Sequence, residues 1–239
     1  MGRFDTVYER KNTRSVKWDM VESLFKADDV LPMWVADMDF KAPDAVNEAL
    51  IERAKHGIYG YTFIDDDVKN AIKNWIKRRH HWEISTDWLN FSPGVVTSLH
   101  IAIKIFTEPQ DKILVQTPVY NPFYTAIENN NRMIVRNPLI REGDKYKIDF
   151  ADFEEKIKQE DVKAFILCSP HNPVGRVWTR EELEEMARIC LKYDVLIISD
   201  DIHCDLIFPG QTHIPIASLS EEISKQTITC MSPTKTFNL

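Results

Sequence analysis

Glycine and cysteine are scarce in this sequence, and neither occurs in a familiar cofactor or metal motif. Its 239 residues include only seven glycines and contain no GxGxxG or GxxxxGK[ST] motif. A dinucleotide-binding Rossmann domain and a nucleoside-triphosphate loop are therefore disfavoured. The four cysteines show no CxxC spacing and three lie in apolar runs, so we expect reduced core residues of a cytoplasmic protein, with no metal site. They are Cys168, Cys190, Cys204 and Cys230.

Long apolar runs and long basic runs are also absent. No segment approaches the ~20 apolar residues of a membrane span, and no apolar signal region opens the chain. The formal net charge is −7, and the one basic cluster, Lys77-Arg78-Arg79, is short enough to be a helix end. We therefore expect neither a membrane nor a nucleic acid as partner. Hydrophobic residues make up 44% of the chain, enough for one large domain and an incomplete second one.

The N-terminal third predicts an arm followed by two helices. Residues 1–40 are rich in aromatic and charged residues and have little periodicity, and Met33–Phe40 is typical of an extended segment entering a loop. Apolar residues then recur at helical spacing over Pro43–Lys55 and Asp67–His80. The loop Gly57–Tyr61 lies between these two helices.

The remainder of the chain alternates between strand and helix patterns. Pro93-Gly94 precedes an apolar helical face, so a helix should begin near Val95. A capping box at Thr179–Glu182 opens another helix, which ends near Lys192. The other expected elements are strands at Lys112–Gln116, Ala164–Cys168, Val195–Ser199 and Thr227–Met231 and a helix at Phe123–Glu128. The unit 164–200 is a βαβ crossover, which predicts a mostly parallel α/β sheet flanked by helices.

Polar residues follow the ends of several of these strands. Tyr120, Asn172 and Asp200 each come shortly after an apolar run, and Lys235 follows the last strand in what we expect to be a loop. In an open α/β sheet, the carboxyl ends of the strands border the ligand-binding crevice. A lysine amine, a buried acid and a helix start suit pyridoxal phosphate, which offers an aldehyde, a ring nitrogen and a phosphate.

Several motifs resemble those of a known superfamily. The segments PGVVTSL, TPVY, SPHNPVG, SDDIH and SPTK resemble the fold-type I pyridoxal-phosphate enzymes, the aminotransferase class I/II superfamily. Within it, MWVADMDF, GIYGY and the histidine of DDIH resemble the MalY/PatB cystathionine β-lyase branch. The resemblance runs from about residue 2 to the end. It implies a pyridoxal-phosphate-dependent transferase-like large domain over 46–239, after an arm and part of a small domain over 1–45.

The resemblance also implies roles for five residues at the ends of the strands. Lys235 would bond to the cofactor aldehyde and later carry the Cα proton. Asp200 would pair with the ring nitrogen, with neighbouring Asp201 as the rival candidate. The cofactor's phenolic oxygen would accept from Asn172 and His203, and Tyr120 would stack on the ring. Tyr124 is close enough in sequence to be confused with Tyr120.

The cofactor's phosphate would lie at the start of a helix. The resemblance implies backbone amides of Val95 and Val96, with a hydroxyl from Ser232, as its donors. Thr97 and Thr234 are weaker candidates. Tyr61 resembles a tyrosine that crosses a homodimer interface to the partner's phosphate, with Tyr59 as runner-up, and loop packing is the alternative for both.

The sequence stops at Leu239, whereas family members continue into the rest of the large domain and a C-terminal small domain. The arginine that binds the substrate carboxylate comes from that missing part, so the chain is either a fragment or a truncated, inactive product. The resemblance implies a carbon–sulfur β-lyase that converts L-cystathionine or related cysteine S-conjugates to a thiol, pyruvate and ammonia. The alternatives are an aminotransferase, a regulatory protein that binds a transcription regulator, and an inactive fragment.

Overall fold

A computed structural model describes residues 3–239 of the chain. It divides into two compact units, Phe63–Ser232 and a smaller one made of Met1–Thr62 with Pro233–Leu239. The domain boundary expected between residues 45 and 46 stays a prediction.

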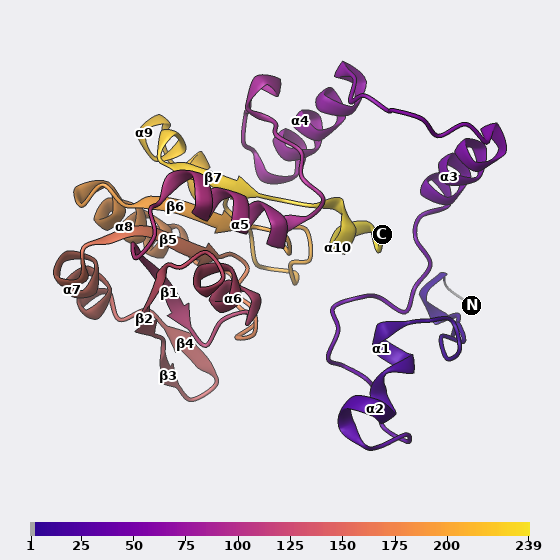
Figure 1. The fold of residues 1–239 in the computed structure, drawn as a ribbon, viewed down its shortest axis with the longest axis horizontal. Coiled ribbons are helices and arrows are strands. Elements are labelled where there is room, and N and C mark those ends of the chain that lie inside the picture. The colour runs from indigo at the N-terminus through magenta and orange to yellow at the C-terminus, as the bar shows by residue number, and fades with distance from the viewer. Residues whose placement is uncertain (1–2) are drawn as a thin grey trace. The chain divides into compact units, whose positions relative to one another are not determined.

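The larger unit is built on a five-stranded sheet in the order β2-β1-β5-β6-β7, and every neighbouring pair is parallel (Figure 1). The strands are β1 (Lys112–Thr117), β2 (Met133–Pro138), β5 (Val162–Cys168), β6 (Leu196–Asp200) and β7 (Thr227–Cys230). The predicted parallel sheet is confirmed. The strand that was expected to end at Ser199 continues to Asp200, which places this acid within the sheet.

Helices cover both faces of this sheet. The larger unit contains the helices α4 (Asp66–His80), α5 (Val95–Phe106), α6 (Pro122–Glu128), α7 (Phe150–Glu160), α8 (Arg180–Lys192) and α9 (Glu221–Lys225), with short 3-10 turns η2 (Thr86–Trp88) and η3 (Ile216–Ser218). Of these helices, α5 and α6 pack on one face of the sheet and α7, α8 and α9 on the other. Helix α5 begins at Val95 as expected, and the capping box of α8 forms at Thr179. Strand β2, helix α7 and the hairpin of β3 (Ile140–Glu142) and β4 (Lys145–Lys147) were not predicted.

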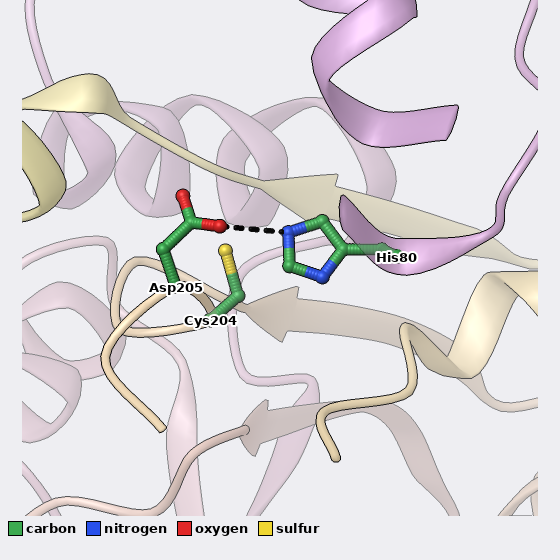
Figure 2. A group of neighbouring side chains, drawn as sticks. All are labelled: His80, Cys204 and Asp205. Carbon is green, nitrogen blue, oxygen red and sulfur yellow. Dashed lines mark ion pairs between the residues drawn. The ribbon is translucent and has the colours of Figure 1, made fainter. Parts of the chain in front are cut away.

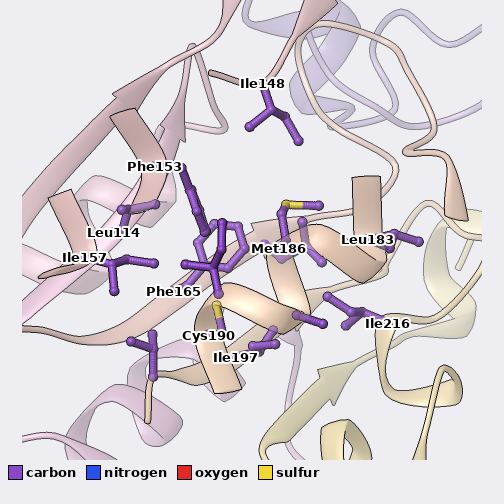
Figure 3. Close-up of a cluster of buried hydrophobic side chains, with 14 of the residues drawn as sticks. Leu114, Ile148, Phe153, Ile157, Phe165, Leu183, Met186, Cys190, Ile197 and Ile216 are labelled. Carbon is purple, nitrogen blue, oxygen red and sulfur yellow. The ribbon is translucent and has the colours of Figure 1, made fainter. Parts of the chain in front are cut away.

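Two apolar clusters fill the spaces between sheet and helices. The cluster in Figure 3 joins Phe153 of α7 and Met186 of α8 to Phe165 and Ile197 of the sheet. The second cluster packs α5 and α6 against the opposite face, which includes Ile198. Because successive strand residues point to opposite faces, Asp200 follows Ile198 toward the α5 side of the sheet.

The chain reverses its winding direction between β1 and β5. After β1 the chain passes through α6 to the edge strand β2, whereas after β5 it passes through α8 to β6. These two helices belong to opposite apolar clusters, so the loops that follow β1 and β5 diverge. Such a switch point opens a crevice at the carboxyl ends of the strands, and ligands of open α/β sheets bind there. The loops concerned contain Tyr120 and Asn172.

Apart from α3, the smaller unit contains only short elements among its described residues, and it has little apolar core. Its elements are η1 (Arg3–Asp5), α1 (Val16–Asp19), α2 (Val21–Phe25), α3 (Asp44–His56) and α10 (Pro233–Phe237). Among its described residues, the buried apolar side chains are Val21 and Pro32. Lys235 lies within α10, so the expectation of a loop at this residue was wrong. Pro233 begins that helix, where its missing N–H leaves no helical hydrogen bond unmade.

None of the described helices is both long and apolar enough to cross a membrane.

Candidate functional site

Asp200 is a buried acid without a cationic partner among the described residues. It lies at the end of β6 between Cys168 and Cys230 on the adjoining strands, and it is only 5% exposed. Burial, with a further contribution from the charge of Asp201, raises the pKa of Asp200 to about 7. Its Oδ1 accepts from the amide of Ile202 at 3.1 Å, and no described residue forms an ion pair with it. A buried carboxylate of this kind is suited to bind a cationic group of a ligand.

The neighbouring Asp201 is fully occupied by side chains of its own unit. Its Oδ1 accepts from the hydroxyl of Ser199, and its Oδ2 lies 2.9 Å from Nε2 of His213. Asp201 and His213 are both buried. Of the two adjacent acids, Asp200 is therefore the one whose carboxylate is left to bind a ligand.

A histidine connects the two loops of the switch point. His171 is buried, and Nε2 lies 2.8 Å from the carbonyl oxygen of Pro118, two residues before Tyr120. Burial lowers the pKa of His171 to about 4, so at neutral pH its ring is uncharged and Nε2–H donates to that carbonyl. Next to it, the amide of Asn172 lies 3.3 Å from Sγ of Cys168. The loops that contain Tyr120 and Asn172 are thus held to one another.

Tyr120 lies close enough to Asp200 for the carboxylate charge to affect the pKa of its phenol. Burial, and after it the charge of Asp200, raises the pKa of the Tyr120 phenol. The ring of Tyr120 meets Phe123 edge-on, with centroids 6.0 Å apart. A flat ring beside a buried acid suits a planar, cationic ligand.

The start of α5 offers backbone amides on the same side of the sheet. Val95 and Val96 occupy its first turn, in which amides have no intrahelical partner, and the helix dipole favours an anion there. Val95 is buried and Val96 is exposed. His203 and Ser232 are half-buried, each with partners in the structure.

The remaining two predicted residues belong to the smaller unit. Nζ of Lys235 donates to the carbonyl oxygen of Ala36 at 2.9 Å, and the side chain of Tyr61 is fully exposed. The larger unit therefore brings Tyr120, Asn172 and Asp200 together. The roles of all the predicted residues toward a cofactor stay predictions.

A second polar group lies at the C-terminal end of α4, where His80 faces Cys204 and Asp205 (Figure 2). Their potential ligand atoms lie within 4.8 Å of one another. However, Asp205 already accepts from Nε1 of Trp75 at 3.1 Å and from Nε of Arg79 at 3.3 Å. Burial also raises the pKa of the Cys204 thiol, so the thiolate that binds metals is disfavoured. This group therefore fastens α4 to the loop after β6 better than it would hold a cation.

Two surface hollows have linings that include none of these residues. One, of about 410 Å³, is lined by residues 41–51 of the smaller unit. The other, of about 220 Å³, lies along the edge strand β2. Neither is lined by a predicted site residue.

Sequence reasoning missed His171, His213 and a charged network in the N-terminal arm. His171 in SPHNPVG could have been found, because it directly precedes Asn172, which the motif had already singled out. The partners of His213 lie twelve or more residues away, and no local pattern connects them.

The chain matches the family model described as "Aminotransferase class I and II" over residues 28–239. It belongs to this family. The resemblance stated from the sequence motifs is thereby confirmed.

Relatives narrow the comparison to one branch of the family. The chain is 50% identical to cystathionine β-lyase PatB of Bacillus subtilis (strain 168) over 99% of its own length and 61% of the relative's. A PLP-bound protein from Clostridium difficile 630, provisionally named an aminotransferase, is 50% identical with a TM-score of 0.95, over 98% of this chain and 60% of that one. Cystalysin from Treponema denticola, which contains pyridoxal 5′-phosphate, is 42% identical with a TM-score of 0.93, over the same shares. The predicted transferase-like fold is confirmed, and the chain spans about 60% of the length of these relatives.

Proposed function

We propose that the protein is a pyridoxal-phosphate-dependent carbon–sulfur β-lyase. Its substrates would be L-cystathionine or related cysteine S-conjugates, which with water give a thiol, pyruvate and ammonia. The observation that carries the proposal is the buried Asp200, which has no ion-pair partner among residues 3–239 and lies near Tyr120 at the switch point of the sheet. The similarity to PatB and cystalysin supports the choice of reaction.

The residues present fit the cofactor. Asp200 would pair with its ring nitrogen, Tyr120 would lie against its ring, and Asn172 and His203 would donate to its phenolic oxygen. Val95 and Val96 would hold its phosphate through their amides, with Ser232 adding a hydroxyl. When bound, the cofactor supplies an electron sink for the negative charge that develops at the substrate Cα.

Lys235 would transfer the proton in the reaction. Its ε-amine would hold the cofactor before substrate enters, and would then accept the proton from the substrate Cα. Asp200 would keep the ring nitrogen protonated by offering it a buried carboxylate. Asn172 would keep the ring from turning, so that the same Cα bond is presented to Lys235 in each turnover.

We further propose a cytoplasmic homodimer. The free, buried cysteines suit a reducing compartment. Helix α3 has no buried residue, and Tyr61 beyond it is fully exposed, so this segment offers surface for a second copy. Tyr61 would reach the partner's phosphate. Sedimentation equilibrium of the protein with and without cofactor tests this state.

The experiment that tests the function combines a spectrum with product analysis. Protein carrying this chain is mixed with pyridoxal phosphate, and its visible absorption is recorded before and after L-cystathionine. A visible band that shifts with substrate, with pyruvate released, is expected. Lys235→Ala should lose the band, whereas Lys225→Ala, which removes an exposed lysine that pairs with Glu221, should retain it. A band and pyruvate release that survive Lys235→Ala would disprove the assignment.

An aminotransferase is the second candidate, because one 50% identical structure carries that provisional name. The two reactions differ in what they consume. A lyase releases pyruvate from cystathionine without an added keto acid, whereas an aminotransferase needs the keto acid as amino acceptor. A regulatory role independent of catalysis would instead leave the interaction with a transcription regulator intact in Lys235→Ala.

A further inference from the structure

The helix that contains Lys235 is bound, through the residue that follows it, to a segment of the N-terminal arm about 200 positions away. Asn238 makes three side-chain hydrogen bonds with this segment. Its Oδ1 accepts from the amide of Met38 at 3.0 Å, and its Nδ2 donates to the carbonyl oxygens of Met38 at 3.1 Å and Phe40 at 2.7 Å. Lys235 itself donates to Ala36 at 2.9 Å. Asn238 thus pairs with Met38 as a neighbouring strand would.

Asparagine meets two requirements at this position. Residue 238 follows the last residue of α10 and has φ of 56°, in the left-handed region that asparagine tolerates better than most residues. Its short amide side chain also combines one acceptor with two donor hydrogens, which the three contacts use. A single residue thereby ends the helix and clips it to residues 38–40.

The same segment of the arm is also bound by cationic residues nearer the N-terminus. Arg10 binds Asp37 at 2.9 Å and Asp39 at 2.8 Å, and the buried Lys17 binds Asp39 at 2.6 Å. Trp18 donates to Asp39 at 2.8 Å. Although burial raises the pKa of Asp39, the hydrogen bonds from Lys17 and Trp18 outweigh it, and the pKa is lowered overall. Residues 37–40, to which Asn238 binds, are therefore held in place by these ion pairs and hydrogen bonds.

We propose that Asn238 is a positioning residue for Lys235. Its hydrogen bonds hold the C-terminal end of α10 against residues 37–40. They thereby fix the direction from which the ε-amine of Lys235 would approach the cofactor aldehyde. This inference depends on the proposed function of Lys235. Holding two reacting groups in one geometry can change a rate by orders of magnitude. Three hydrogen bonds from the residue that directly follows the five-residue helix α10 provide that restraint.

The test uses substitutions that separate the side chain from the backbone. Asn238→Gly retains access to the left-handed backbone but removes all three hydrogen bonds. Asn238→Asp retains the size and the acceptor for the Met38 amide, but it directs oxygen at the carbonyls of Met38 and Phe40. The control is Asn47→Ala in the same unit, where Asn47 makes one side-chain bond, to Ala42 at 3.2 Å.

Three readouts are taken. The first is the rate at which pyridoxal phosphate becomes attached to Lys235, trapped with borohydride and located by peptide mass. We expect it to fall about tenfold in both Asn238 variants and to stay unchanged in Asn47→Ala. The second is the pH profile of the visible band, which should move in the same two variants only. The third is hydrogen exchange at Met38, expected to rise about three- to tenfold in Asn238→Gly but not in Asn238→Asp.

The outcomes distinguish this inference from the proposed function. Attachment at the wild-type rate in both Asn238 variants, with the pH profile unchanged, would overturn the positioning role. If the unmodified protein attaches no cofactor at Lys235, the proposed function fails. In that case the reactivity of Lys235 toward acetic anhydride, relative to Lys225, decides the positioning role without cofactor. A change of more than about threefold in both Asn238 variants supports it, and wild-type reactivity contradicts it.

Discussion

The two units of this chain are stabilised by different physical means. The larger unit buries two apolar clusters against a parallel sheet, whereas the smaller unit buries little apolar surface and is held by a network centred on Asp37 and Asp39. Apolar packing is non-directional, so it holds a sheet together without specifying one side-chain atom. Charged hydrogen bonds are directional and fix particular atoms. Lys235, which we expect to act in catalysis, belongs to the smaller unit, whose described residues are held mainly by such contacts.

The largest effect should come from the core of the larger unit. Phe165 is fully buried beside Phe153 in the cluster of Figure 3. Phe165→Ala should lower the free energy of unfolding by about 3–5 kcal/mol, through lost burial and the cavity left behind. Chemical denaturation followed by circular dichroism measures this. Leu50→Ala, at an exposed position of α3, should cost less than about 0.5 kcal/mol, and an equal loss at both sites would contradict the contrast between the units.

The next effect depends on pH. Here a substitution at the candidate site should raise the free energy of unfolding, whereas most substitutions lower it. The folded-state pKa of Asp200 is about 7, above its ordinary 3.8, so folding favours the protonated acid and stability is lost as pH rises between these values. Asp200→Asn should therefore stabilise the cofactor-free protein at pH 8 by about 2–4 kcal/mol and have little effect at pH 4. It should also abolish tight cofactor binding. Melting curves at the two pH values check the first claim.

Asp201→Asn is the matched control for that result. It removes a negative charge that contributes to the raised pKa of Asp200. Titration of carbon-13-labelled aspartate by NMR should then find the pKa of Asp200 lower than in the unmodified protein. A pKa that stays unchanged would mean that burial alone sets it.

A smaller effect should follow from breaking the network of the smaller unit. Lys17→Met removes the cation that lies 2.6 Å from Asp39 but retains much of the apolar stem. Because both acids of the network are partly exposed, we expect a loss of about 1–2 kcal/mol, detected as faster hydrogen exchange over residues 36–40. The pKa of Asp39 is lowered, so this loss should fade as pH falls below its ordinary value of 3.8. If the loss of stability in Lys17→Met persisted at acid pH, it would come from lost packing of the lysine stem and not from the lost ion pair.

The smallest effect should come from a helix cap in the larger unit. Thr179 accepts from the amide of Glu182 at 3.3 Å, and Glu182 accepts in return from the amide of Thr179 at 2.8 Å. Thr179→Ala should cost about 1 kcal/mol, since the amides at the start of α8 lose one partner. Thermal unfolding measures it, and Thr179→Ser, which retains the hydroxyl, should restore most of the loss.

The crossover from β5 through α8 to β6 was the part of the fold most accessible to sequence reasoning. Its strands are β-branched apolar runs and its helix carries a capping box, so local patterns specify each element. The hairpin of β3 and β4 was missed because its strands have three residues each and none has a buried alternation. Helix α7 was also missed, although Asp149 caps it by accepting from the amide of Asp152 at 3.0 Å.

By itself, the sequence determined the parallel sheet, the start of α5 and the kinds of residue at the strand ends, because periodicity and capping act over a few neighbouring positions. Only the tertiary structure decided which acid is available, since Asp201 is occupied by Ser199 and His213 whereas Asp200 is not. It also decided that Asn238 meets Met38 and Phe40, because a contact between residues 200 positions apart depends on the folded path of the whole chain.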